Sequence, residues 1–324
     1  MRAAAVKCKR KHAGREPDSV SSRIPARVHG SVAARAPVAY YAVPNQPVSD
    51  PDRPIIDMMH MDAAISTTYG ELPALLLSAP DGAQATVTLY GAHLVSWRGA
   101  DGRERMFCSA RSALDGSRAI RGGVPVIFPQ FAERGSGMRH GFARVSNWRV
   151  LETGVDNGRA FALFALEAAD LDPRHAQAWP HGFALALRVA IHANELTMRF
   201  EVRNTGGDAF PFAAALHTYH LVDDIATVRI NGVEREELVI TDKFDRVYED
   251  IAPPLALVDG GLMLTIRQEG FKDAVVWNPG AADAAALADM ADEEYRRFVC
   301  VEPALLDGPV LQPGESWVGE YHVS

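Results

Sequence analysis

The feature of this sequence that most limits its fold is an alternation of apolar and other residues that recurs over short segments. In residues 182–192 the large apolar side chains fall on every second position. They are Phe183, Leu185, Leu187, Val189 and Ile191. Because successive side chains of a strand point to opposite faces, this period predicts a half-buried antiparallel strand.

Further short segments, β-branched or alternating, follow one another from Met61 onward. They are residues 85–90, 93–97, 159–167, 196–202, 227–230, 262–268, 274–277, 298–301 and 316–322. Turn signals occur at residues 204–207 and at Asn231-Gly232. Only residues 281–290 read clearly as a helix. Many strands with almost no helix predict an all-β fold, a large antiparallel sandwich that forms one domain over residues 58–324.

The first 57 residues have a different composition, rich in Arg, Lys, Pro, Ser and Ala and without periodicity. We expect residues 1–57 to be disordered, because such a composition cannot bury a core. Met58, Met59 and Met61 stand just before the ordered pattern. The extension is therefore also explained by a start codon placed too far upstream. Its Arg-rich character resembles a transit peptide, whereas a secretory signal would need an apolar core after the basic cluster.

Composition excludes several classes of function. The 324 residues carry a formal net charge of −8, which argues against nucleic acid as a partner. No apolar run approaches the roughly 18 residues of a membrane span. The cysteines Cys8, Cys108 and Cys300 are odd in number and lack metal-ligand spacing, so we expect a reducing, cytoplasmic location. Zinc, phosphate-loop and dinucleotide motifs are missing, so we expect no metal and no cofactor. We also expect a monomer.

Cationic residues gather between Arg121 and Arg144. Arg121 precedes a Gly-Gly pair, whose backbone can approach a ligand closely. Two guanidinium groups from one loop system would hold a phosphate ester by bidentate hydrogen bonds. The alternative is that both arginines pair with local carboxylates such as Asp115 and Glu133.

Three candidate site residues lie further along the chain. His217 follows an apolar run, and is either a rigidly placed functional group or a hydrogen-bonded core histidine. Glu302 closes a buried-looking strand before Pro303, where an ionised carboxylate needs a partner or a task. Asp245 could accept hydrogen bonds from sugar hydroxyls or cap a turn.

Several motifs follow one another in the sequence. They are Arg121-Gly122-Gly123, Phe128-Pro129-Gln130-Phe131, His140-Gly141-Phe142-Ala143-Arg144, Leu216-His217-Thr218-Tyr219, Asp245-Arg246-Val247-Tyr248, Trp277-Asn278-Pro279 and Cys300-Val301-Glu302-Pro303. In this order they resemble the glucose-6-phosphate 1-epimerases, the hexose-6-phosphate mutarotase branch of the aldose 1-epimerase superfamily. The resemblance runs from about Tyr69 to Trp317. It implies a galactose mutarotase-like β-supersandwich with a ligand cleft on a concave sheet face.

The resemblance also implies the roles of the two reacting groups. An aldose changes anomer when a base removes the C1 hydroxyl proton while an acid protonates the ring oxygen. Glu302 matches the family's base and His217 its acid. We expect nearby carboxylates to keep His217 protonated at neutral pH.

The remaining motif residues would hold the substrate, a small hexose phosphate. By resemblance, Arg121 and Arg144 take the 6-phosphate. His140 would bond the C1 oxygen, or is a loop histidine bonded to backbone. Gln130 and Asp245 would position hydroxyls, and Trp277 would face the sugar ring. The family usually carries an aromatic residue where this chain has His220.

Three other functions stay open on sequence grounds. The sandwich could bind a sugar phosphate without catalysis, or could act on unphosphorylated aldoses. A glycoside hydrolase would need a second carboxylic acid near Glu302.

Overall fold

The computed structural model describes residues 63–324, so the predictions for residues 1–57 lie outside the described residues. Its strands form three antiparallel sheets. The four-stranded sheet has the order β1 (Ala64–Tyr69), β2 (Leu72–Ser78), β3 (Gln84–Thr88) and β4 (His93–Arg98). The eight-stranded sheet has the order β12 (Arg229–Asn231), β14 (Leu255–Asp259), β15 (Leu262–Glu269), β18 (Ser316–Val323), β9 (Glu195–Asn204), β8 (Phe183–His192), β7 (Arg159–Glu167) and β6 (Arg149–Asp156).

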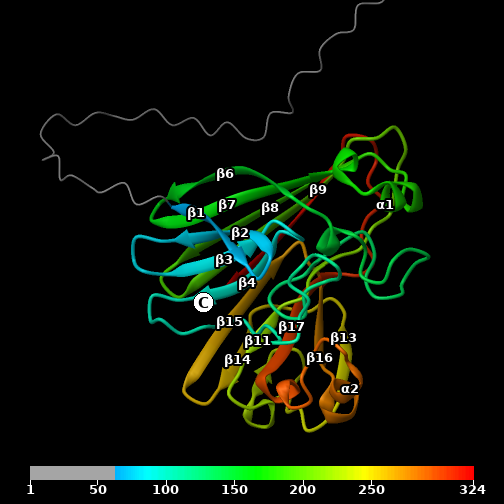
Figure 1. The fold of residues 1–324 in the computed structure, drawn as a ribbon. Coiled ribbons are helices and arrows are strands. Elements are labelled where there is room, and N and C mark those ends of the chain that lie inside the picture. Colours follow the sequence, from blue (N-terminus) through cyan, green and yellow to red (C-terminus); the bar gives the residue numbers. More distant parts are fainter. Residues whose placement is uncertain (1–62) are drawn as a thin grey trace, which may run out of the picture. The chain divides into compact units, whose positions relative to one another are not determined.

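The six-stranded sheet carries most of the candidate site. Its order is β13 (Phe244–Tyr248), β16 (Asp273–Asn278), β17 (Phe298–Leu305), β10 (Ala214–Leu216) and β5 (Val126–Ile127), and β11 (Tyr219–Leu221) also pairs with β17. Figure 1 shows β13, β16, β17 and β11 in the lower half of the view, at the same height as β14 of the eight-stranded sheet. The expected all-β antiparallel sandwich is confirmed.

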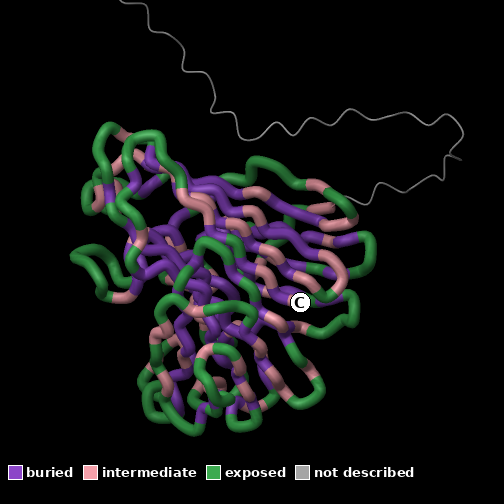
Figure 2. The backbone as a smooth tube through the Cα atoms, turned by 180° about the vertical axis from the view of Figure 1, so that it is seen from behind, coloured by how far each residue is buried: buried purple, intermediate pink, exposed green. Residues whose placement is uncertain are grey.

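The main core gathers apolar side chains from all three sheets. They form one buried cluster, which includes Leu77 and Leu94 of the four-stranded sheet, Phe164 and Leu187 of the eight-stranded sheet and Val301 of the six-stranded sheet. Figure 2 shows the buried segments running through the strands and the exposed segments at their connecting loops. Burial of this apolar area supplies the main drive for the sandwich to form.

The strand β8 is more buried than its alternation predicted. The prediction that this strand is half buried is wrong, because nearly every residue of β8 is buried. The second face of β8 is largely alanine, and Ala190 lies between Phe161 of β7 and Thr197 of β9. Longer neighbours screen such a short side chain. The neighbouring β9 does alternate strictly between partly buried and buried residues.

The helices differ in extent from the prediction. The helix α2 (Gly280–Ala286) ends before the predicted residue 290, because Leu287 is already extended. The helix α1 (Pro173–Ala178) was not predicted, although Asp172 caps it and Pro173 occupies its first turn. Among the residues that the structure describes, no helix is long and apolar enough to cross a membrane.

The strand β17 continues past Glu302, so the prediction that this residue ends its strand is wrong. On one side Glu302 and Pro303 pair with Val275 and Ala274 of β16. On the other side, β17 pairs with β11 at residues 298–300 and with β10 at residues 304–305. Pro303, which has no N–H, therefore lies where this second ladder is interrupted. His217 occupies the same interruption, between β10 and β11.

The side chain of Asn278 joins the end of β16 to the start of β17. Its Nδ2 donates to the carbonyls of Tyr295 and Phe298 at 2.8 and 2.9 Å. Its Oδ1 accepts from the Gly280 N–H at 2.9 Å. Because Asn278 is fully buried, its amide satisfies these three backbone groups in place of water.

We predict that Asn278→Leu lowers the free energy of unfolding by at least about 2 kcal/mol, since each buried polar group left unpaired costs about 1–3 kcal/mol. Urea unfolding measures this change. The control is Gln177→Leu, which removes an exposed amide from α1. Equal unfolding midpoints for the two variants would contradict the structural role of Asn278.

Candidate active site

A cavity of about 470 Å³ opens beside the six-stranded sheet. Seven of the eight site residues expected from the sequence line it: Arg121, His140, Arg144, His217, Asp245, Trp277 and Glu302. They come from β13, β16, β17, the link between β10 and β11, and loops of the first half of the chain. The pairing of β13 with β16 sets Asp245 opposite Trp277.

His217 and Glu302 form a buried pair at the bottom of this set. Nδ1 of His217 lies 3.2 Å from Oε1 of Glu302. The side chains are only 10% and 1% exposed. The second carboxylate oxygen, Oε2, has no hydrogen-bond partner among the described residues. An unpartnered buried oxygen is costly, and such groups in proteins commonly have a functional reason.

Burial drives both members of this pair towards their neutral forms. It raises the pKa of Glu302 well above its usual value, and Asp245 adds to this rise. Burial also lowers the pKa of His217 well below its usual value, with further lowering by His140, Arg121 and Arg144. The expectation that carboxylates keep His217 protonated is therefore wrong. Cationic neighbours and burial outweigh the single carboxylate in contact.

Aromatic rings fix the orientation of the His217 imidazole. The ring of Tyr219 stacks on it, with centroids 4.9 Å apart and an interplanar angle of 11°. Trp277 meets it edge to face at 5.9 Å, and His140 does so at 5.5 Å. These contacts leave the imidazole little freedom to turn, so the His217–Glu302 contact is preorganised.

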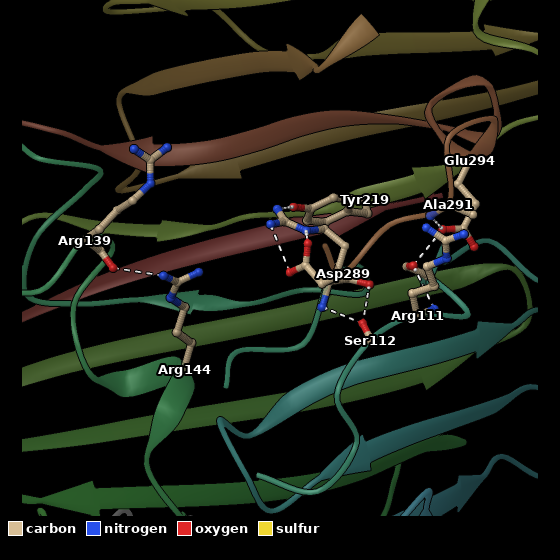
Figure 3. A network of polar contacts seen from close by, with 10 residues as sticks. Arg111, Ser112, Arg139, Arg144, Tyr219, Asp289, Ala291 and Glu294 are labelled. Carbon is tan, nitrogen blue, oxygen red and sulfur yellow. Dashed lines mark hydrogen bonds and ion pairs between the residues drawn. The ribbon is translucent and has the colours of Figure 1, made fainter. Parts of the chain in front are cut away.

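Arg121 is already paired, with a carboxylate that the sequence did not suggest. Its Nε and one terminal nitrogen donate to Asp289 at 3.3 and 3.2 Å, and the other terminal nitrogen donates to the Tyr219 hydroxyl at 3.1 Å. Tyr219 and Asp289 lie together at the centre of Figure 3. The alternative that Arg121 pairs with a carboxylate is correct. The partner, however, is the sequence-distant Asp289 and neither of the local residues Asp115 and Glu133.

Arg144 is less completely paired than Arg121. One terminal nitrogen donates to the Arg139 carbonyl at 2.9 Å, as Figure 3 shows. Its buried Nε has no hydrogen-bond partner among the described residues. Burial, together with the charges of Arg121 and Arg139, lowers the pKa of Arg144 to about 10. A buried cation beside other cations favours the binding of an anion.

Gln130 does not line this cavity, although the sequence placed it in the site. It lines a neighbouring cavity of about 430 Å³. Its side-chain Nε2 donates to the Ala132 carbonyl at 2.9 Å, and its Oε1 accepts from the Gly137 N–H at 2.8 Å. A Cβ at Gly135 would lie 2.5 Å from that Oε1. The amide thus holds the loop of residues 132–140 against the body of the protein.

His140 stands at the end of this loop, and the alternative of a loop histidine bonded to backbone is confirmed. It lines the site cavity, and its Nδ1 accepts a hydrogen bond from the Ala132 N–H at 3.3 Å. Burial, followed by the charges of Arg144 and Arg139, lowers its pKa to about 3. The ring is therefore neutral, and the acceptor role of Nδ1 leaves Nε2–H as its donor.

Sequence reasoning missed three charged residues of the cavity lining, and one further residue, His220, lies outside it. The cavity is also lined by Arg118, Arg139 and Asp289, to which the sequence assigned no role. Asp289 could not be paired with Arg121 from sequence, because 168 positions separate them. His220 stays outside the cavity lining and its Nε2 lies 3.1 Å from the Tyr321 hydroxyl. The departure from the family pattern at His220 therefore leaves the cavity wall unchanged.

We predict that Gln130→Leu loosens the loop of residues 132–140 because it removes the amide that bonds Ala132 and Gly137. Trypsin should cut after Arg134 and Arg139 faster than in the parental protein, and the melting temperature should change little. Gln312→Leu, which alters an exposed amide far from the loop, is the control. Unchanged cleavage of Gln130→Leu in the absence of any sugar would rule out this role for the amide.

Comparison with known proteins identifies the family of this chain. The sequence profile of the family "Aldose 1-epimerase" matches residues 73–250. Proteins named "Putative glucose-6-phosphate 1-epimerase" from Cenchrus ciliaris and Escherichia coli are 33% and 30% identical to this chain. These alignments cover 81% and 80% of this chain, and 87% and 89% of the relatives.

A solved structure is similar over the same range. The YeaD protein of Salmonella typhimurium, described as a "putative mutarotase", superposes with a TM-score of 0.71 at 26% identity. The superposition covers 81% of this chain and 92% of that protein. The profile match and the relatives above 30% identity together show that this chain belongs to the aldose 1-epimerase family and is an isomerase that acts on sugars.

Proposed function

We propose that this enzyme interconverts the α and β anomers of a hexose 6-phosphate, with glucose 6-phosphate as the substrate. The observation that carries the proposal is the half-buried Arg144, which lines the same cavity as the His217–Glu302 pair and whose Nε has no hydrogen-bond partner among the described residues. An unphosphorylated hexose carries no anionic group that could pair with the Arg144 guanidinium. The names of the relatives from Cenchrus ciliaris and Escherichia coli support the same substrate.

In this mechanism Glu302 removes the C1 hydroxyl proton through Oε2, and His217 gives a proton to the ring oxygen. The ring opens, the C1 carbonyl turns, and reclosure yields the other anomer. The pair needs one proton in total, since the neutral pair and the ion pair differ only in which partner holds it. That proton passes between Nδ1 and Oε1, which lie 3.2 Å apart; such contacts are often poorly aligned in a free enzyme and tighten when substrate binds. No proton from solvent is required before ring opening.

The substrate's phosphate contributes to this chemistry as well as to binding. Arg121 and Arg144 lower the pKa of His217, and so oppose the imidazolium that acts as the acid. A phosphate dianion beside Arg144 offsets that repulsion, which makes the ion-pair form of His217 and Glu302 easier to reach. The binding energy of the 6-phosphate is thereby used to lower the barrier of a step at C1.

The other cavity residues position the sugar. Asp245 lies close enough to raise the pKa of Glu302, so its carboxylate sits beside the reacting end of the ring. It would accept hydrogen bonds from hydroxyls there. Trp277 would offer an apolar face to the sugar ring, and Nε2–H of His140 would donate to the C1 oxygen.

We predict that Glu302→Gln and His217→Asn each reduce the anomerisation rate of glucose 6-phosphate by about 100-fold or more, since each removes one proton-transfer group. Polarimetry or coupled kinetics measures the rate. Glu302→Gln preserves size and His217→Asn keeps a polar side chain, and circular dichroism checks that the sheets persist. A variant that interconverts anomers near the parental rate would show that its residue is not the acid or base.

We predict that Arg144→Ala raises KM for glucose 6-phosphate by about 10–150-fold, because a charge-assisted hydrogen bond contributes about 1.5–3 kcal/mol. The KM for free glucose should stay near the parental value. Arg144→Lys should restore part of the loss, since the bidentate geometry belongs to the guanidinium. Removing the positive charge also eases protonation of His217, so kcat on free glucose should not fall. Equal losses on both sugars would assign Arg144 to the sugar ring or to the scaffold.

A further inference from the structure

We propose that Cys300, together with His217 and Glu302, forms a binding site for a soft divalent cation such as Zn²⁺, and that the bound cation blocks the acid and base. The ligand atoms of these three residues all lie within 4.8 Å of one another. The inhibition rests on the proposed function, whereas the binding of the cation does not.

The backbone brings the three groups together without any rearrangement of the sheet. Cys300 and Glu302 are two residues apart on β17, so their side chains project from the same face. His217 lies at the neighbouring interruption between β10 and β11, with Tyr219 of β11 directly paired to Cys300. One strand, β17, and the link between the two strands that pair with it on one side therefore supply all three ligands.

The donor set fits zinc better than a hard cation. Thiolate, imidazole and carboxylate are the three ligand types that zinc accepts, and three protein ligands leave its fourth position open. The thiolate disfavours Mg²⁺ and Ca²⁺, which prefer oxygen. With Glu302 and His217 lining the cavity, the fourth position would face the space where the sugar binds.

The polar atoms of the site lack the partners that a purely structural cluster would have. Glu302 is 1% exposed, and its Oε2 has no hydrogen-bond partner among the described residues. His217 Nδ1 makes no hydrogen bond of good geometry, although Glu302 lies 3.2 Å away. A cation would satisfy both atoms. It would also displace the thiol proton of Cys300, since a coordinating thiol ionises even when burial raises its pKa.

The charges around the site set its selectivity. Arg121 and Arg144 oppose any cation, but Asp289 already offsets Arg121. Asp245 adds a carboxylate on the cavity side. Ions held mainly by charge would therefore bind poorly, whereas a metal that forms a bond to sulfur has a further source of affinity. This difference separates Zn²⁺ and Cd²⁺ from Mg²⁺.

Cadmium is the direct probe, because a thiolate bound to Cd²⁺ gives a charge-transfer absorption in the ultraviolet. The full chain is used with Cys8→Ser in every sample, so that only Cys108 and Cys300 can report. Cys108→Ser, the matched control, should keep the band. Cys300→Ser and Cys300→Ala should both lose it, and the second variant guards against a folding defect in the first. A band that survives loss of Cys300, or that is missing from Cys108→Ser, overturns the site.

Zinc inhibition is the second readout, scored for each variant as activity with zinc relative to activity without it. The zinc concentration that halves activity should rise about 10-fold or more in Cys300→Ser, since even a residue that only supports a ligand contributes about 10–100-fold to affinity. Mg²⁺ should not inhibit, and a chelator should restore the rate. Equal zinc sensitivity with and without Cys300 contradicts the proposal. A cadmium band in a protein without anomerase activity would leave the metal site intact and reject the proposed function instead.

Discussion

The contact between His217 and Glu302 is the interaction on which the rest of the site depends. It exists because the ladder beside β17 is interrupted between β10 and β11, which lets an imidazole meet a carboxylate inside the sheet. Pro303 marks the same interruption on the opposite strand. Burial shifts the pKa values of both groups towards their neutral forms, and in the proposed mechanism the pair becomes an acid and a base when one proton moves across it.

The two arginines of the cavity differ in how they are held: Arg121 is fixed by neighbouring side chains, whereas Arg144 is available to a ligand. Asp289 and the Tyr219 hydroxyl hold Arg121 in place, and Tyr219 in turn stacks on His217. Arg144 keeps a buried nitrogen without a hydrogen-bond partner among residues 63–324, and depends on the loop of residues 132–140 for the carbonyl that positions it. In the proposed mechanism, the charge of a substrate phosphate beside Arg144 would influence proton transfer in the His217–Glu302 pair.

Sequence reasoning predicted the strand framework well where periodicity was clear, and poorly where strands were short. The segment 159–167 matches β7, whereas β5, β10 and β11 have two or three residues each and carry no measurable period. Seven of eight expected site residues line the cavity. Gln130 instead holds the neighbouring loop, because its amide is hydrogen-bonded to the backbone of Ala132 and Gly137.

The sequence by itself determined the all-β class and the family, since these follow from local period and from short motifs. Only the tertiary structure decided which charges meet. Asp289 reaches Arg121 across 168 positions, and Cys300 turns towards His217 because of strand register. It also reversed the expected protonation of His217, since desolvation and the fields of neighbouring cations depend on the packed arrangement of the whole chain.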